Sequence, residues 1–336
     1  MSLYKEIYHT SYLLDKTILV TGGAGFIGSN IVEYLLHHGA KKVRVLDNLS
    51  NGFQKNIDLF RSHPNFEYMH GDIVNYHDCH RACAGVDLIS HQAALGSVPR
   101  SIENPLATHN ANATGFINML NAARQANVQR FVYASSSSVY GDSIASPKHE
   151  ADLGTPLSPY AVSKLTNELY GNIFGLTYGI KTIGLRYFNV FGPRQDPNGP
   201  YAAAIPIFMN GLLHNTPVFI NGDGSTTRDF TFVANAVQAN IRALCATDDN
   251  AFTRVYNIAV GKSTSLNELF TMLKSIARST QNPVYREERA GDVKHSLASV
   301  DLARKHLAYN PSFDMAEGLR ITYQWFEATF GNKLQA

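Results

Sequence analysis

The amino-acid sequence predicts an α/β fold: a Rossmann-type, doubly wound parallel sheet followed by a smaller, mixed C-terminal substrate domain. Three observations predict it. Short apolar runs alternate with runs of helical length from residue 17 to residue 187. A glycine-rich turn joins the first apolar run to the first helical one. Beyond Arg186, proline and glycine become dense between Gly192 and Pro206, which indicates a change to loop-rich structure.

Each predicted strand is a short apolar run, and each predicted helix has a start or stop signal. The strands are predicted at residues 17–21, 43–46, 66–69, 87–91, 130–135 and 181–187. The helices are predicted at residues 25–38, 103–126 and 159–178. Gly39 ends the first helix, and the last has Ser158 as its N-cap, Pro159 at its first position and Gly179 as its stop. Residues 1–16 are expected to form an extra helix.

Composition and charge exclude several classes of function. The 336 residues are 44% hydrophobic and 17% charged, enough to build a folded core. The net charge of +2, without a long basic run, argues against nucleic-acid binding. No apolar stretch approaches the length of a membrane span or of a signal-peptide core, so neither is expected. Three cysteines make no disulfide framework, and a cytoplasmic location is expected.

Two of these cysteines, Cys79 and Cys83, lie close to His77 and His80, which raises the question of a metal site. The spacing matches no zinc-binding pattern, and no second ligand pair follows. The cysteines are one helical turn apart, which is typical of a stripe that faces a hydrophobic core. No metal site is predicted.

The glycine-rich turn is the predicted phosphate-binding loop. Gly22, Gly25 and Gly28 follow the first strand and open the first helix, whose N-terminus offers N–H groups to a pyrophosphate. Asp47 ends the second strand, where a carboxylate can accept from the adenosine ribose hydroxyls and would repel a 2′-phosphate. An ordinary turn at Asp47 and Asn48 is the alternative interpretation. The glycines upstream favour the cofactor site, and NAD is predicted rather than NADP.

Asp72 follows the third strand, where its carboxylate could reach the adenine amine. Capping of the next helix is an equally good interpretation of this residue.

Tyr160 and Lys164 are four residues apart on a predicted helix, so both lie on one face, one turn apart. The nearby ammonium and the positive ring of NAD⁺ both favour the phenolate, which would make Tyr160 a general base near neutral pH. Four serines at 135–138 follow the fifth strand, at the edge where parallel sheets bind ligands. One hydroxyl could relay a substrate proton, whereas polar loop and capping serines are the alternative interpretation.

These motifs together resemble those of the extended short-chain dehydrogenase/reductase superfamily, from Thr17 to Trp325. The resemblance is closest to the UDP-hexose 4-epimerases, and within them to the branch acting on UDP-N-acetylglucosamine and UDP-N-acetylgalactosamine. The narrower match is carried by residues 91–101, 157–161, 184–192, 195–199 and 291–296. It implies NAD as the cofactor, a UDP-sugar as the substrate, and a homodimer formed through the helices at 103–126 and 158–178.

The motifs and the resemblance together assign roles to single residues. The catalytic residues are Ser136, Tyr160 as the base and Lys164 as its partner. The cofactor-binding residues are Gly22, Gly25, Phe26, Ile27, Gly28, Asp47, Asn48, Asp72, Ile73, Gln92, Tyr160, Lys164 and Tyr187. The substrate-binding residues are Gly96, Ser97, Ser136, Ser137, Ser138, Asn189, Gln195, Ala203, Arg228, Arg289, Asp292 and Ser296.

Within the substrate set, Asn189 is expected to hold the diphosphate, and Arg228 and Arg289 to clamp it with their guanidinium groups. A surface ion pair is the alternative interpretation of each arginine. Asp292 matches the residue that accepts from the uridine ribose.

Two features of the resemblance bear on the reaction and the sugar. Related dehydratases carry an Asp-Glu pair where this chain has Ser137 and Ser138, so elimination of water is not expected. Epimerases restricted to unacetylated hexoses carry a bulky tyrosine at the position of Ser296. Serine leaves room for an N-acetyl group, with Gly96 and Ser97 expected across the pocket, unless Ser296 is merely a small loop residue.

The chain is therefore expected to interconvert UDP-N-acetylglucosamine and UDP-N-acetylgalactosamine through a 4-keto intermediate. Residues 1–188 are predicted as the NAD-binding domain, to which residues 230–262 return, and 189–336 as the UDP-sugar-binding domain. One alternative is a 4-epimerase of UDP-N-acetylglucosaminuronate, whose carboxylate Arg100 or Lys294 could pair. A more remote alternative is a non-catalytic dinucleotide sensor, which the presence of both Tyr160 and Lys164 disfavours.

Overall fold

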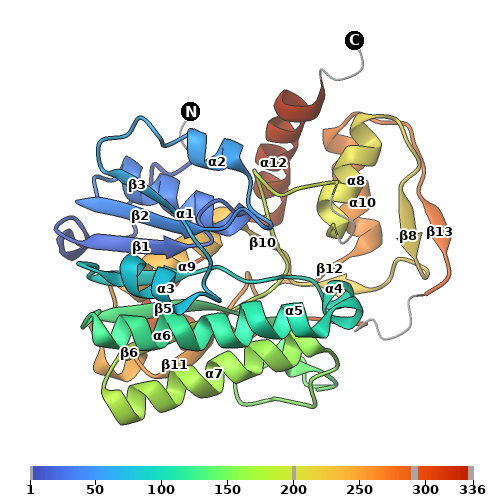
Figure 1. Ribbon diagram of the computed structural model, residues 1–336. Helices are drawn as coiled ribbons and strands as arrows, with labels where there is room; N and C mark the ends of the chain where they lie inside the picture. The colour runs from blue at the N-terminus through green and yellow to red at the C-terminus, as the bar shows by residue number, and fades with distance from the viewer. Residues whose placement is uncertain (1–2, 199–201, 289–293, 332–336) are drawn as a thin grey trace.

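The computed structural model describes residues 3–198, 202–288 and 294–331. Within these residues lies a seven-stranded sheet with the order β11-β6-β5-β4-β1-β2-β3, and every neighbouring pair of strands is parallel (Figure 1). The strands are β1 (Thr17–Thr21), β2 (Lys42–Asp47), β3 (Phe66–His70), β4 (Leu88–His91), β5 (Arg130–Ser136), β6 (Lys181–Tyr187) and β11 (Arg254–Ile258). The predicted doubly wound parallel sheet is confirmed.

Helices cover both faces of this sheet. One face carries α1 (Phe26–His37), α9 (Val233–Leu244) and α11 (Asp301–Leu307); the other carries α3 (Tyr76–Cys83), α6 (Gly115–Gln125) and α7 (Pro159–Tyr178). Successive strand residues point to opposite faces, so Ile18 and Val20 join the core under α1, whereas Leu19 packs with Phe116 of α6. All five residues of β1 are buried, and its apolar centre at residues 18–20 is what a strand covered on both faces requires.

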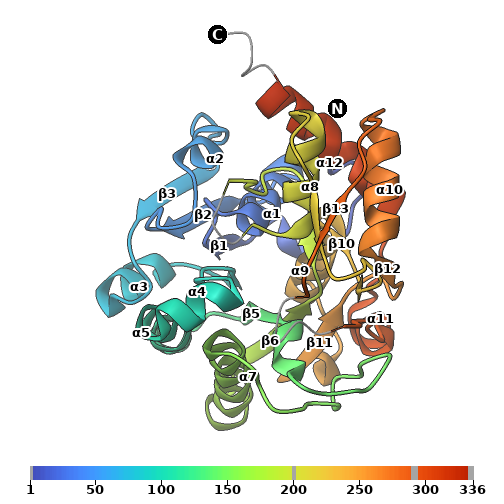
Figure 2. The same cartoon turned by 90° about the vertical axis from the view of Figure 1, so that its right-hand side faces the viewer.

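After β6 the chain leaves the sheet, and it returns to it only at β11. The intervening elements are β7 (Val190–Phe191), α8 (Ala204–Leu213), β8 (Phe219–Asn221), β9 (Thr227–Arg228), β10 (Thr231–Phe232), α9 and the short turn η4 (Asp249–Ala251). After β11 come β12 (Thr264–Ser265), α10 (Leu266–Ile276), β13 (Val284–Arg286), α11 and α12 (Met315–Phe330). The strand pairs β8–β13 and β9–β12 lie with α8 and α10 on one side of the molecule, away from β2 and β3 (Figures 1 and 2).

The long helix predicted at residues 103–126 is interrupted. Residue 103 ends α4 (Val98–Glu103), and a new helix begins with α5 (Pro105–His109), passes through a π-helical turn η2 (Asn110–Thr114) and continues as α6. Asn104 is extended at φ −138° because the proline after it disfavours helical geometry. Its side chain accepts from Ala107 N at 3.0 Å and so caps the new helix.

The predicted N-terminal helix is also wrong for the described residues 3–16, whose helical turn is the short 3₁₀ turn η1 (Ser11–Leu13). This segment lies against α1, where Tyr8 stacks on Tyr34 with ring centroids 5.4 Å apart. The Tyr8 amide donates to Tyr34 Oη, and the Tyr4 hydroxyl donates to Asn30 Oδ1 at 2.6 Å. The polar groups of the segment are thus satisfied by side chains of α1 rather than by helical bonds.

Cys79 and Cys83 are both buried in the core beneath α3, as their one-turn spacing predicts. Among the described residues, no helix is long and apolar enough to cross a bilayer.

Candidate active site

A cavity of about 550 Å³ lies at the carboxyl ends of β1, β2, β3 and β4. The strand order reverses at β1, and such a reversal opens a crevice above a parallel sheet. Of the predicted cofactor residues, seven line this cavity: Gly22, Gly25, Asp47, Asn48, Asp72, Ile73 and Gln92. Phe26, Ile27 and Gly28 form the first turn of α1, directly behind the loop.

The loop glycines are required by space as well as by conformation. Gly22 has φ +68°, and a Cβ there would lie 2.7 Å from Ala93 N, in the floor of the cavity. A Cβ on Gly28 would collide with the carbonyl oxygen of Gly22, which packs α1 closely against the loop. The backbone therefore forms an open cradle at the N-terminus of α1, which fits a dinucleotide pyrophosphate.

Asp47 closes a turn and also lines the cavity. Its carboxylate accepts from Leu49 N at 2.8 Å, as a turn residue would, and from Ala24 N at 2.9 Å in the glycine loop. Burial raises the pKa of Asp47, and these two backbone bonds oppose that shift. The turn thus orients a carboxylate on the cavity wall, where it fits a ribose diol.

Asp72 does not cap the next helix. The N-cap of α3 is Asn75, which accepts from His77 N, whereas Asp72 accepts from Val74 N at 2.8 Å. Its other oxygen accepts from the Asn48 amide at 3.0 Å and so links the ends of β2 and β3.

Gln92 and Tyr187 belong to one hydrogen-bond network beyond β4 and β6. The Tyr187 hydroxyl donates to Gln92 Oε1 at 3.0 Å and accepts from Asn240 Nδ2 at 2.7 Å. The Gln92 amide donates to Asn240 Oδ1 and Ser90 Oγ. Asn240 lies on α9, more than fifty residues after β6, and no local pattern in the sequence indicated it.

The predicted catalytic side chains come together at the start of α7. Ser158 caps this helix by accepting from Ala161 N at 3.1 Å. Lys164 is buried and donates to the carbonyl of Ala134 on β5 at 2.9 Å, with its Nζ 5.9 Å from the centre of the Tyr160 ring. The end of β5 places the Ser136 hydroxyl near the Tyr160 phenol, close enough to lower the pKa of that phenol.

The pKa shifts of Tyr160 and Lys164 differ from the expectation that the nearby ammonium would favour the phenolate. Burial raises the pKa of Tyr160, and the hydrogen bond with Ser136 is what lowers it in part. The Lys164 ammonium donates to the Ala134 carbonyl, and no hydrogen bond joins it to the Tyr160 phenol in the described part of the chain. Burial also lowers the pKa of Lys164 to about 8, against the opposing effect of the Glu168 carboxylate. Lys164 thus titrates close to neutral pH.

The four serines have separate partners. Ser135 is buried and donates to Glu168 Oε1, and Ser136 accepts from Ser138 N at 3.1 Å. Ser136 is therefore the N-cap of the 3₁₀ turn η3 (Ser137–Tyr140) and also the residue facing Tyr160. The capping and catalytic interpretations apply to the same side chain.

A second cavity, about 1210 Å³ and open to solvent, is lined by Asn189, Gln195, Ala203 and Arg228, all four predicted to bind the substrate. Gln195 Oε1 is buried there without a hydrogen-bond partner in the described part of the chain. Arg286, which sequence reasoning missed, lines the same cavity with its guanidinium over the Phe219 ring. The pairing of β8 with β13 brings these last two residues together. The predicted Arg289 and Asp292 lie outside the described residues.

Ser296 is buried and its amide donates to the carbonyl of Thr227, next to Arg228 on β9. The structure thus places Ser296 beside the strand that supplies a cavity arginine. Gly96 is exposed, with open space around the position of a Cβ, and Ser97 caps α4 by accepting from Arg100 N. That Gly96 and Ser97 face Ser296 stays a prediction.

Asn112 is a further residue that sequence reasoning missed. It lies in the π-helical turn, and its side chain accepts from Leu95 N at 2.7 Å and donates to Leu95 O at 3.0 Å. It also donates to Ser163 Oγ on α7. The turn thus ties a wall of the cofactor cavity to the catalytic helix, as irregular helical turns at functional sites often do.

The comparisons with known proteins agree with this site. Residues 18–259 match the family described as NAD dependent epimerase/dehydratase family. A putative UDP-glucose 4-epimerase of Methanocaldococcus jannaschii is 37% identical over 92% of this chain and 98% of its own.

Two solved structures are similar throughout. The UDP-N-acetylglucosamine 4-epimerase from Methanobrevibacter ruminantium, in complex with UDP-N-acetylmuramic acid, has a TM-score of 0.88 and 38% identity, covering 94% of this chain and 99% of that one. The UDP-glucuronic acid 4-epimerase from Bacillus cereus, in complex with UDP-glucuronic acid and NAD, has a TM-score of 0.86 and 30% identity, covering 93% and 99%. The chain belongs to the NAD-dependent epimerase/dehydratase family and is an NAD-dependent enzyme.

Proposed function

We propose that this chain is a UDP-sugar 4-epimerase that interconverts UDP-N-acetylglucosamine and UDP-N-acetylgalactosamine. The observation that carries the proposal is that Ser136, Tyr160 and Lys164 come together at the end of β5. This strand lies between β4, which is followed by Gln92 of the cofactor cavity, and β6, which is followed by Asn189 of the larger cavity. The names of the relatives share the 4-epimerase reaction but differ in the UDP-sugar. They therefore support the reaction more strongly than they support one particular sugar.

In the proposed mechanism, NAD would supply the acceptor and donor of the hydride at C4 of the sugar, and a positive charge that favours the Tyr160 phenolate. Gly22, Asp47 and the N-terminus of α1 would hold NAD. Tyr160 removes the proton of the 4-hydroxyl group. Ser136 donates a hydrogen bond to the 4-oxygen or relays its proton to Tyr160. The sugar becomes a 4-keto sugar, turns about its diphosphate, and regains the proton from Tyr160 with C4 inverted.

The rest of the chain would hold the nucleotide while the sugar turns. Asn189 and Arg228 lie in the cavity where a diphosphate needs donors, and Arg286 adds a second guanidinium there. Inversion at C4 requires that the UDP stays fixed while the hexose is free to turn and present its other face. Ser137 and Ser138 supply no carboxyl group that could eliminate water, which supports epimerisation over dehydration.

The acetylated sugar is supported by Ser296 and by the name of one similar structure. The uronate alternative is supported less, because both of its candidate cations have partners. Arg100 donates to Asn51 Oδ1 at 2.6 Å, and Lys294 Nζ lies 3.5 Å from Glu288 Oε1.

The test of this function is to incubate the purified protein with UDP-N-acetylglucosamine, UDP-glucose or UDP-N-acetylglucosaminuronate, without added cofactor, and to separate the epimers by chromatography. Conversion of UDP-N-acetylglucosamine to UDP-N-acetylgalactosamine, faster than that of the other two, is expected. Conversion of the uronate alone would overturn the sugar and keep the mechanism. No conversion of any, even with NAD supplied, would overturn the function.

The pocket argument has its own test. Ser296→Tyr should lower kcat/KM for the acetylated sugar at least about 100-fold, because overpacking costs about 1–3 kcal/mol and the acetamide loses its space, and far less for UDP-glucose. Ser296→Ala is the matched control and should keep the preference. Equal losses on both sugars in Ser296→Tyr would contradict the assignment.

A further inference from the structure

Three consecutive residues at the end of β5 are bound to three residues spaced one turn apart on α7. The Ala134 carbonyl accepts from Lys164, and the Ser136 hydroxyl contacts Tyr160. Between them, Ser135 donates to Glu168 Oε1 at 2.5 Å. Glu168 is buried and continues the stripe that Tyr160 and Lys164 begin. Of these three helix residues, it is the one without a role in the proposed chemistry.

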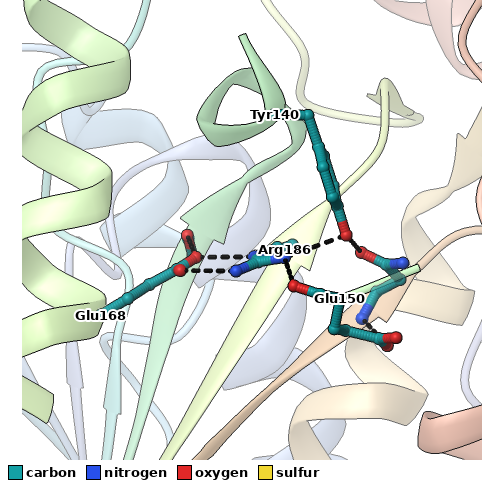
Figure 3. Close-up of polar contacts among 6 residues, drawn as sticks. Tyr140, Glu150, Glu168 and Arg186 are labelled. Carbon is teal, nitrogen blue, oxygen red and sulfur yellow. Dashed lines mark hydrogen bonds and ion pairs between the residues drawn. The ribbon is translucent and has the colours of Figure 1, made fainter. Parts of the chain in front are cut away.

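Arg186 holds the Glu168 carboxylate from the neighbouring strand. Its Nε donates to Oε1 at 2.8 Å and its Nη2 to Oε2 at 2.7 Å, a bidentate pair between two buried side chains (Figure 3). Arg186 also donates to Tyr140 Oη and to the Glu150 carbonyl. Ser135 and Arg186 are register partners in the β5–β6 pair, so both face α7. Because Arg186 is held by four hydrogen bonds and binds both carboxylate oxygens of Glu168, the carboxylate has one fixed position.

Among the charged groups near Lys164, the Glu168 carboxylate is the one that raises its pKa against the effect of burial. His91 on β4 is neutral at working pH, because burial and then Lys164 lower its pKa to about 3. Tyr133 on β5 is neutral too, since burial raises its pKa well above the usual value. Arg186 on β6 is cationic and neutralised by Glu168. On α7 itself, Tyr160 and Glu168 are the neighbours one turn away on either side.

We propose that Glu168 is a positioning residue for the epimerase reaction, because its carboxylate fixes the Ser135 hydroxyl beside Ser136 and stabilises the Lys164 ammonium one turn earlier. The inference rests on the proposed function in using Tyr160 as the base. Lys164 assists that base only while it is charged, since an ammonium near the ring favours the phenolate. Without Glu168, burial alone acts on a lysine that already titrates at about 8.

The decisive variant is Glu168→Gln, which keeps the shape and an acceptor for Ser135 but loses the charge. The high-pH fall in kcat, which reports loss of the Lys164 proton, should move to lower pH by about 1 unit or more, the usual effect of a close opposite charge. KM for the UDP-sugar should change little. Ser135→Ala should instead lower kcat about 3- to 10-fold with the fall at its wild-type pH, because the charge remains.

Glu150→Gln is the matched control. This buried glutamate belongs to the same network, but its carboxyl group accepts from Asn257 N and lies away from α7. It should keep the wild-type pH profile. A folded Glu168→Gln protein with an unmoved profile, or a Glu150→Gln protein with an equal shift, would overturn the proposal.

If the Glu168→Gln protein does not fold because Arg186 has lost its partner, the double variant Glu168→Gln/Arg186→Gln removes both charges. It should show a smaller shift in the same direction, because the like charge of Arg186 is also gone. Profiles are measured on whichever UDP-sugar the wild type converts. If the wild type converts none, the proposed function fails. The inference is then tested by NMR titration of the ¹³Cε resonance of Lys164, assigned with Lys164→Met: an equal pKa in wild-type and variant protein refutes it.

Discussion

At the residue scale, the most informative result is that one side chain can have a structural role and also lie in the predicted site. Asp47 closes a turn and presents a carboxylate to the cofactor cavity. Ser136 caps η3 and faces Tyr160. The two interpretations that the sequence offers for each residue are therefore not exclusive, because a carboxylate or hydroxyl oxygen has more than one lone pair to share.

Tyr160→Phe is the substitution that tests the base. Without the phenol, no group at this place can take the 4-hydroxyl proton, so kcat should fall by a factor of about 10²–10⁴. Affinity for the UDP-sugar, measured by calorimetry, should change less than about threefold, because Asn189 and the cavity arginines remain. Tyr178→Phe, near the exposed end of the same helix, is the control. Wild-type turnover in Tyr160→Phe would remove Tyr160 from the mechanism.

Residues in short motifs could be predicted from sequence, whereas partners from distant segments could not. Gly22 and Asp47 belong to one strand-turn-helix-strand unit, and Tyr160 and Lys164 to one helix. Asn240 reaches Tyr187 only because α9 packs under the sheet after a long excursion of the chain. No local periodicity carries such a contact, since it depends on tertiary packing.

At the scale of elements, α7 is the part on which the site most depends. Its first turn carries Tyr160, so the direction of that turn sets the position of the phenol. The Ser158 side chain and Pro159 define where the helix begins, and Gly179, at φ +72°, defines where it ends. These signals are local, which is why the sequence predicted this helix correctly at both ends.

Ser158→Ala should lower the free energy of unfolding by about 0.5–2 kcal/mol, because the Ala161 amide loses its cap. It should also lower kcat several-fold, since the turn that carries Tyr160 can fray. Ser265→Ala removes the cap of α10, remote from α7, and should cost similar stability in urea unfolding with unchanged kcat. An equal loss of kcat in both variants would assign the effect to global stability.

Two elements escaped prediction for physical reasons that differ. The helix predicted at 103–126 breaks at Asn104 because of the proline that follows. The proline is visible in the sequence, but the prediction gave more weight to the apolar pattern around it. The segment at 3–16 has a helix-like composition, yet its tyrosines gain more by stacking on α1. Tertiary contacts outweigh weak helical propensity.

At the scale of the whole molecule, α5 and α7 expose a set of apolar side chains on the face away from the sheet. They are Leu106, Val162, Leu169, Ile173 and Leu176, each at least half exposed. Figure 1 shows α5, α6 and α7 forming one outer layer. An apolar face of this kind is typical of a protein interface. We propose that it forms the homodimer that the resemblance implies, by packing against its own copy.

The dimer is tested by light scattering after size exclusion. The wild type should elute at twice the chain mass, and Leu169→Glu/Leu176→Glu should weaken association at least about 100-fold, because each leucine contributes about 1.5–3 kcal/mol when buried. Leu59→Glu, equally exposed on a different face, should stay dimeric. A monomeric wild type at micromolar concentration would contradict the proposal.

The return of the chain to the sheet at β11 has a consequence for biosynthesis. When β6 leaves the ribosome, its outer neighbour is still missing, and so is α9, of whose residues all but Arg242 are buried between α1 and the strands. One apolar face of the nascent sheet therefore stays uncovered until the segment lining the larger cavity has also been made. Partly made chains of this kind expose surface that invites aggregation and chaperone binding. A truncated chain ending before β11 should therefore leave the edge of β6 unpaired and lack Leu266 and Arg286 of the larger cavity.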